Sequence, residues 1–209
     1  MDDGAALLIH LGMSGTIIMG NADAKHDHAS FLFENGERAT YRDPRRFGMM
    51  DLAQQSALTE HPSLARLGPE PLGRDFNATI LEKAAQRRRQ PVKTALLDQT
   101  FVAGLGNIYV CEALFQAGVS PFRPTSSLAR AECKKLAAAV KDVLRRAIRA
   151  GGSTLKDHRR PSGETGYFQH SFAVYGRTGE PCPRCGGEAR IERALQAGRP
   201  TFHCPACQR

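Results

Sequence analysis

Two Cys-x-x-Cys pairs close to the C-terminus are the residues whose spacing points most directly to chemistry. The pairs are Cys182 with Cys185 and Cys204 with Cys207, and residues 186–203 separate them. This spacing is typical of a zinc ribbon, in which each pair supplies two thiolates to one tetrahedral ion. Four protein thiolates leave no open position for a substrate. We therefore expect one structural zinc ion, held by these four cysteines.

Two other interpretations of the cysteines stay open at this stage, a catalytic zinc ion and a pair of disulfides formed in an oxidising compartment. So small a segment has little apolar material, so metal binding would supply much of its folding free energy. Residues 186–203 can form a hairpin that carries Arg190, Arg193 and Arg199. The purpose that we predict for this hairpin is to hold arginines against phosphates.

A glycine-containing turn, Gly104-Leu105-Gly106-Asn107, comes directly before a predicted helix. Such a turn exposes backbone N–H groups to an anion, and Asn107 is a residue type that caps helices. The turn lacks the third glycine of the dinucleotide-binding fingerprint and follows helices rather than a strand, which argues against a Rossmann fold. On local evidence alone, a plain helix cap is an equally good interpretation.

Composition favours a nucleic-acid partner. Lys and Arg outnumber Asp and Glu by 29 to 21, which gives a net charge of +8 and an isoelectric point near 9.5. A basic chain is attracted to polyanions, and we expect nucleic acid as the partner ahead of an anionic membrane surface. No apolar run is long enough to span a bilayer, and Met1-Asp2-Asp3-Gly4 does not resemble a secretory signal. We expect a cytoplasmic, nucleoid-associated protein.

The elements that must position these groups change in type along the chain. Residues 5–53 have the pattern of strands, and the Asn35-Gly36 pair predicts a tight hairpin turn. A connector rich in Gly and Pro, residues 67–73, marks a domain boundary. Helices are predicted beyond it, at residues 76–87, 92–98, 108–117 and, most clearly, 136–148. Residues 153–170 are predicted to form a long loop, and residues 172–209 short strands around the cysteines.

Several segments, taken together and in order, resemble the formamidopyrimidine-DNA glycosylase family. They are residues 10–15, 25–28, 43–48, 104–109, 152–157, 175–177 and the two cysteine pairs. The resemblance spans nearly the whole chain. It implies an α+β fold with a partial N-terminal β-sandwich, a helix-two-turn-helix bundle and a C-terminal four-cysteine zinc-finger hairpin. The implied domains are a remnant of the catalytic domain (1–60), a DNA-binding domain with a lesion-capping loop (61–171) and a zinc finger (172–209).

The resemblance implies base-excision repair of duplex DNA. Members of the family are glycosylases with AP lyase activity, by β,δ-elimination, and act on 8-oxoguanine and formamidopyrimidine lesions, flipping the damaged base out of the duplex. The motif Asp43-Pro44-Arg45-Arg46-Phe47-Gly48 favours these purine lesions over the oxidised pyrimidines of the related endonuclease VIII. Two non-enzymatic alternatives stay open, a damaged-DNA binding module and a zinc-ribbon protein that docks onto RNA or another protein.

By motif match, three side chains fill the void that the flipped base leaves, namely Met13, Arg45 and Phe47. Met and Phe are apolar wedges, and Arg can donate to the acceptors of the orphaned cytosine. Without the motif, Met13 and Phe47 would be read as ordinary core residues.

Other matched positions contact DNA. The family positions that hold the phosphates flanking the lesion correspond to His10, Asn107, Tyr175 and Arg199 in this chain. Further DNA-contacting positions correspond to His26 and Arg88. For Arg199, catalysis of δ-elimination is the alternative role. Arg88 lies in a run of three arginines that could instead be a solvated helix end.

A further matched segment, residues 156–167, closes over the flipped base in the family, and the matched positions are Lys156, Gly163, Gly166 and Tyr167. Its glycines suit a segment that must move. Lys93 and Lys156 are either close to this loop or surface lysines.

Family members begin with Pro-Glu-Leu-Pro-Glu, whose N-terminal proline amine attacks the sugar, and they place a catalytic Lys before the strand matched by residues 5–9. This chain begins Met1-Asp2-Asp3-Gly4, so the resemblance predicts an N-terminally truncated chain that binds damaged double-stranded DNA but lacks excision activity. Half a sandwich leaves strand edges and apolar faces uncovered. We expect a monomer if the protein is complete, a tendency to aggregate as truncated, and weaker folding of residues 1–60 than of the rest.

Overall fold

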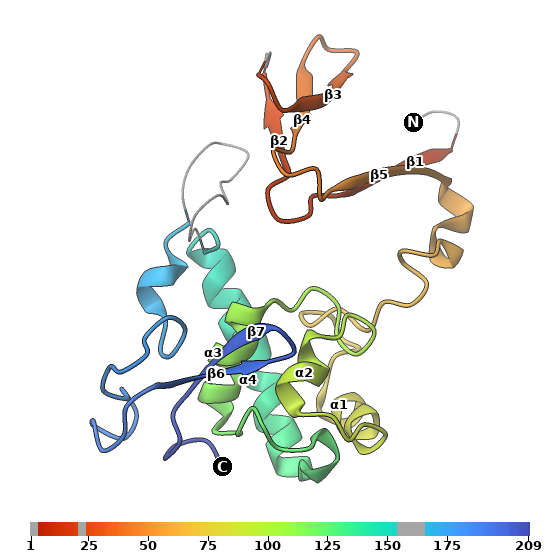
Figure 1. Cartoon of the computed structure of the whole chain (residues 1–209). Helices are drawn as coiled ribbons and strands as arrows, with labels where there is room; N and C mark the ends of the chain where they lie inside the picture. Colours follow the sequence, from red (N-terminus) through yellow and green to blue (C-terminus); the bar gives the residue numbers. More distant parts are fainter. Residues whose placement is uncertain (1–3, 21–23, 154–165) are drawn as a thin grey trace. The chain divides into compact units, whose positions relative to one another are not determined.

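The order of strands and helices along the chain follows the hydrophobic patterns (Figure 1). The structure is a computed structural model that describes residues 4–20, 24–153 and 166–209. The described chain forms two compact units. The first comprises the residues up to Ala65 together with those from Arg149 to His170, and the second comprises the residues from Arg66 to Ile148 and from Ser171 to Arg209.

Strands in one unit and helices with a short hairpin in the other confirm the α+β fold class. No helix in the described ranges is both long and apolar enough to cross a bilayer.

The first unit contains two small antiparallel sheets. Its elements are β1 (Ala5–His10), β2 (Thr16–Met19), β3 (Asp27–Leu32), β4 (Arg38–Arg42), β5 (Met49–Gln54) and the 3-10 helix η1 (Gln55–Glu60). Strand β1 pairs with β5, and the other sheet has the order β2-β4-β3. The predicted hairpin joins β3 to β4. There Gly36 adopts a φ of 82°, and the amide of Phe33 donates to the carbonyl oxygen of Glu37 over 2.8 Å.

These sheets have little core of their own. Among the described residues up to Ala65, the buried apolar side chains are Ala39 and Tyr41, both on β4. Larger apolar side chains on other strands of this unit face solvent, with 72% of Leu32 on β3 and 62% of Leu52 on β5 exposed. Polar interactions must therefore carry much of the local order in this unit.

The second unit is built around helices. They are α1 (Ala78–Gln86), α2 (Val92–Leu97), α3 (Asn107–Ala117), the 3-10 helix η2 (Thr125–Ser127) and α4 (Arg130–Arg149). The 3-10 helix η3 (Phe168–Ser171) belongs largely to the first unit and occupies the end of the segment predicted as a long loop. The face of α4 with helical spacing is buried, as predicted, and Leu136, Val140 and Val143 are at most 1% exposed. Helix α3 ends at Gly118, whose φ of 73° is the left-handed conformation that glycine adopts most readily.

The C-terminal hairpin shares its core with α3. It consists of β6 (Glu192–Gln196) and β7 (Arg199–His203), and the two turn residues between them both have positive φ, as a tight hairpin requires. Strand β7 packs against α3 (Figure 1). The buried side chains of this shared core are Cys111, Phe115, Val174, Cys182, Ile191, Phe202 and Cys204. The hairpin is therefore held by apolar packing on α3 as well as by its cysteines.

Candidate functional site

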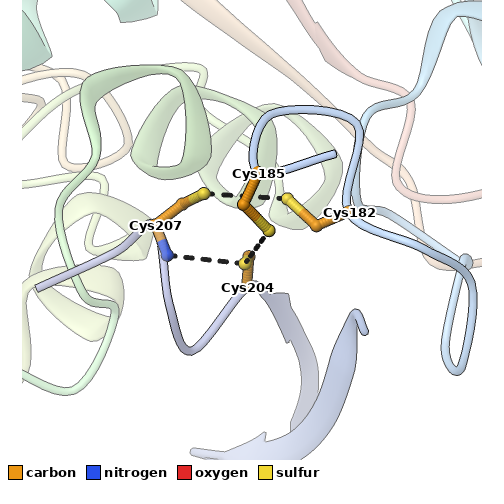
Figure 2. A group of neighbouring side chains, drawn as sticks. All are labelled: Cys182, Cys185, Cys204 and Cys207. Carbon is orange, nitrogen blue, oxygen red and sulfur yellow. Dashed lines mark hydrogen bonds between the residues drawn. The ribbon is translucent and has the colours of Figure 1, made fainter. Parts of the chain in front are cut away.

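The four C-terminal cysteines converge on one point (Figure 2). Their sulfur atoms all lie within 4.8 Å of one another, with 3.8 Å between those of Cys182 and Cys207 and 4.0 Å between those of Cys185 and Cys204. A disulfide would need about 2.05 Å, so the cysteines are free thiols and not two bridges. Four thiol groups at this spacing could hold one metal ion of the kind that prefers sulfur.

The surroundings of the thiols set how readily each loses its proton. Burial raises the pKa of Cys182, but hydrogen bonds from the backbone N–H groups of Cys185 and Arg184 and from the thiols of Cys204 and Cys185 together lower that pKa to about 7. Burial and the neighbouring sulfur of Cys182 raise the pKa of Cys207 to about 12. An ion bound by four thiolates must displace the remaining protons, so metal binding here depends on pH.

A buried glutamine ties this cluster to the end of α3. Gln208 is 4% exposed, and its side-chain oxygen accepts a hydrogen bond from the amide of Cys204 over 2.9 Å. Its side-chain amide donates to the carbonyl oxygen of Val119 over 2.9 Å. The second cysteine pair is therefore fixed to the helical part of the unit even without an ion.

The carbonyl oxygen of Pro200 is the second point of attachment of the hairpin. It accepts hydrogen bonds from Nζ of Lys93 and from Nδ2 of Asn107, each over 2.9 Å, and Lys93 also donates to the hydroxyl of Thr201 over 2.8 Å. These bonds join α2 and α3 to the start of β7. Arg199, the residue before Pro200, is therefore held in place from both helices.

Two interpretations from the sequence are wrong at this point. Asn107 does not cap α3, because Gly106 occupies the cap position and Asn107 is the first helical residue, with its side chain turned to the hairpin. Lys93 is not a surface lysine, because it is fully buried, and burial lowers its pKa. Both departures have the same cause, since each side chain bonds to a carbonyl oxygen about a hundred residues away along the chain.

A buried carboxylate holds the segment that precedes the cysteines. Glu112 on α3 is 3% exposed. Its two oxygens accept hydrogen bonds from the successive amides of Ala173, Val174 and Tyr175 over 2.8, 3.0 and 2.9 Å. The ring of Tyr175 lies 4.7 Å from that of Phe202 on β7. Glu112 thus fixes the backbone of Tyr175, which the sequence predicts to contact a phosphate.

In the first unit, the three predicted void-filling side chains lie together on the surface. The guanidinium carbon of Arg45 is 4.5 Å from the ring centre of Phe47, and its Nη1 is 3.8 Å from the sulfur of Met13. Met13 is 70% exposed and Phe47 is 57% exposed. The interpretation of these two as core residues is therefore wrong. We call Met13, Arg45 and Phe47 the wedge cluster.

Other predicted contact residues have definite places in the first unit. His10 ends β1, and its Nδ1 accepts a hydrogen bond from the amide of Gly12 over 3.1 Å. The carbonyl oxygen of His26, just before β3, accepts from the amide of Asp43 over 3.0 Å. Gly166 is packed so closely to the backbone of Gly152 that a side chain would collide with it.

Of the predicted residues of the matched loop and the arginine run, the structure describes Gly166, Tyr167 and Arg88. Tyr167 is 65% exposed, while Lys156 and Gly163 lie outside the described residues. In the second unit, Arg88 is paired with Asp98 over 2.7 Å and lies 5.0 Å from the ring centre of Phe101. Its side chain is therefore already engaged within the protein.

The sequence did not single out three residues that position this site, Asp43, Glu112 and Gln208. For Glu112 a signal was present, because an acidic residue stands among apolar neighbours in the helical run Val110-Cys111-Glu112-Ala113-Leu114. A carboxylate on a buried helix face needs donors. Which donors it finds cannot be read from the sequence.

The chain matches two family models, described as the formamidopyrimidine-DNA glycosylase N-terminal domain over residues 1–50 and the H2TH domain of the same enzyme over residues 67–159. It is 52% identical to the formamidopyrimidine-DNA glycosylase of Ruegeria pomeroyi and 53% identical to that of Rhodospirillum rubrum. Both matches cover the whole of this chain and 78% of the relative.

Solved structures agree with these matches. The MutM (Fpg) protein of Thermus thermophilus is 43% identical, with a TM-score of 0.88 over 98% of this chain and 76% of that one. The Fpg of Lactococcus lactis in complex with DNA containing an abasic site is 36% identical, with a TM-score of 0.88 over 99% of this chain and 76% of that one.

Glu112→Gln should destabilise the second unit. The amide side chain has no negative charge and has one acceptor oxygen where the carboxylate has two, so at least one of the three backbone N–H groups loses its partner. Hydrogen bonds to a charged group contribute about 1.5–3 kcal/mol, and we expect the free energy of unfolding in urea to fall by about that amount. Glu188→Gln, at an exposed glutamate, is the matched control and should have no measurable effect. Equal stability of the two variants would contradict this role.

Proposed function

The chain belongs to the formamidopyrimidine-DNA glycosylase family, and from this we propose that it recognises oxidised purines, 8-oxoguanine and formamidopyrimidine, in duplex DNA during base-excision repair. Solved relatives from Lactococcus lactis are complexes with DNA that contains an abasic site or Fapy-dG. The single observation in this chain that carries the proposal is the exposed wedge cluster.

The chemistry of the wedge cluster suits a duplex from which one base has been flipped out. Apolar side chains left in water are disfavoured, and Met13 and Phe47 would gain by stacking into the gap. The guanidinium of Arg45 can donate to the acceptor atoms of the unpaired base on the other strand. Reading that base makes the cluster sensitive to which base stands opposite the lesion.

Phosphate contacts are proposed for side chains in both units. His10 and His26 are the candidates in the first unit, and Asn107, Tyr175 and Arg199 are those in the second. Asn107 and Arg199 are the best supported. Asn107 begins α3, where backbone N–H groups attract an anion, and bonds to the Pro200 carbonyl oxygen, while Arg199 directly precedes Pro200 in the chain. The proposed phosphate contact of Arg88 uses the guanidinium N–H groups that are not bonded to Asp98 or Thr100.

We propose that the four cysteines bind one structural zinc ion. Tetrahedral coordination by four thiolates leaves no position for water or substrate, so the ion would stabilise the hairpin and take no part in the reaction. Residues 182–207 would then hold Arg199 on a rigid support.

The activity that belongs to this family is that of a DNA glycosylase and AP lyase. We propose that a polypeptide of these 209 residues binds lesions without excising them, because none of its residues matches the family's proline nucleophile, the glutamate beside it or the catalytic lysine. A secondary amine is suited to attack on the sugar because the iminium ion that it forms draws electrons from the sugar. Arg199 alone cannot supply that nucleophile, since its guanidinium stays protonated.

Lesion binding can be tested by fluorescence anisotropy with duplexes that differ at one position. The unmodified chain should bind a duplex with a tetrahydrofuran abasic analogue opposite cytosine more tightly than the intact duplex. Arg45→Ala should reduce that preference about tenfold, since one specific base contact contributes about 1–3 kcal/mol. Arg38→Ala, the same charge change on β4, should keep it. Equal affinity of the unmodified chain for both duplexes would refute the proposed function.

Zinc binding can be tested by measuring the metal content of the purified chain after dialysis. We expect one ion per chain at neutral pH, less than one in Cys207→Ser, and one again in Cys133→Ala, which removes a cysteine outside the cluster. Content should fall as the solution is acidified, because protons compete with the ion for the sulfur atoms, including that of Cys182, whose pKa is about 7. Full occupancy after all four cysteines of the cluster are replaced by serine would show that the cluster is not the site.

The absence of excision can be tested by borohydride trapping on a duplex that contains 8-oxoguanine. The 209-residue polypeptide should form no covalent adduct under conditions in which the Ruegeria pomeroyi relative forms one. The same polypeptide should still shift the duplex in a native gel. A trapped adduct would show that an amine within these 209 residues serves as nucleophile.

A further inference from the structure

A fully buried carboxylate lies beneath the wedge cluster. Asp43 follows β4 and is 0% exposed. Four donors surround its two oxygens. On Oδ1 they are the hydroxyl of Ser14 at 2.6 Å and the amide of Arg45 at 3.3 Å, and on Oδ2 the amide of Gly48 at 2.8 Å and the hydroxyl of Tyr41 at 3.0 Å.

Three of these donors are, or directly follow, residues of the wedge cluster. Ser14 follows Met13 in the chain, Arg45 is itself a member, and Gly48 follows Phe47. Two loops that are about thirty residues apart in the sequence therefore meet on one carboxylate. Their relative position sets where the Met13 sulfur stands with respect to the guanidinium of Arg45.

The backbone around Asp43 leaves these loops little freedom. Its carbonyl oxygen is hydrogen-bonded to Nε2 of His28 over 2.8 Å and accepts from the amide of Arg46 over 3.3 Å. Arg46 has a φ of 55°, which is uncommon for a residue with a side chain. A side chain at Gly48 would collide with the hydroxyl of Tyr41 and come within 2.6 Å of the carbonyl oxygen of His10.

The hydrogen bonds require a carboxylate. Two oxygens without protons can accept all four donors, whereas an asparagine would offer one oxygen and turn its own N–H groups toward the donors on the other side. The hydroxyl of Ser14 and the amide of Gly48 hold the pKa of Asp43 well below its usual range. The group therefore stays charged and acceptor-only at neutral pH.

We propose that Asp43 is a positioning residue that sets the geometry of Met13, Arg45 and Phe47 before DNA binds, and so determines the preference for the base opposite the lesion. This inference rests on the proposed function. Because Asp43 is buried and its oxygens are occupied, it acts through the wedge cluster and not by touching DNA. Because the first unit has a small apolar core, the hydrogen bonds to Asp43 supply most of the order in the two loops.

The test measures dissociation constants for three duplexes, with the abasic analogue opposite cytosine, with the analogue opposite adenine, and without a lesion. Asp43→Asn should reduce the cytosine-over-adenine preference by about fivefold and leave the affinity for the intact duplex within about twofold. Ser14→Ala, which removes one donor and keeps the carboxylate, should reduce the preference by a smaller factor. Asp51→Asn, the same charge change at an exposed carboxylate of β5, should retain it.

A merely structural role would lower the affinity for all three duplexes together, as partial unfolding does, and that result in both Asp43→Asn and Ser14→Ala would overturn the proposal. An unchanged cytosine preference in both variants would also overturn it and leave the proposed function intact. If the unmodified chain does not distinguish lesion from intact duplex, the proposed function fails and this inference fails with it.

Discussion

A carboxylate taken away from water must be surrounded by hydrogen-bond donors, and this requirement shapes both units of the chain. Asp43 meets it with two hydroxyls and two backbone amides, and Glu112 meets it with three successive backbone amides. In each case the donors belong to segments that carry side chains proposed to meet DNA. A buried charge thus orders a loop that has little apolar surface to bury.

The hairpin of the second unit is also fixed before DNA binds, but by a different set of interactions. One end is held by four clustered sulfur atoms and by Gln208, and the other by the Pro200 carbonyl oxygen, which Lys93 and Asn107 share. Between them, Phe202 packs into the core that α3 provides. Arg199 is therefore presented from a strand fixed at both ends, which lowers the entropy that it would lose on meeting a phosphate.

Much of this could be predicted from the sequence, because the relevant patterns are local. Cysteine spacing predicts a shared site, and the structure brings the four sulfur atoms within 4.8 Å. The apolar residues of α4 predict its buried face. The partners of Asp43, Glu112, Lys93 and Asn107 could not be predicted, since they come from segments that are between about thirty and a hundred residues away and only folding brings them together. The division at residues 60 and 171 and the roles of the individual DNA-contacting side chains stay predictions.

Buried carboxylates hold the loops in place before DNA arrives. Amide hydrogen exchange of the DNA-free chain, followed by NMR, tests this most directly at Gly48 and Val174, whose N–H groups are bound by Asp43 and Glu112. Exchange at both sites should be at least about tenfold slower than the intrinsic rate of an unstructured peptide. Exchange at the intrinsic rate, with protection arising only when a damaged duplex is added, would contradict the claim.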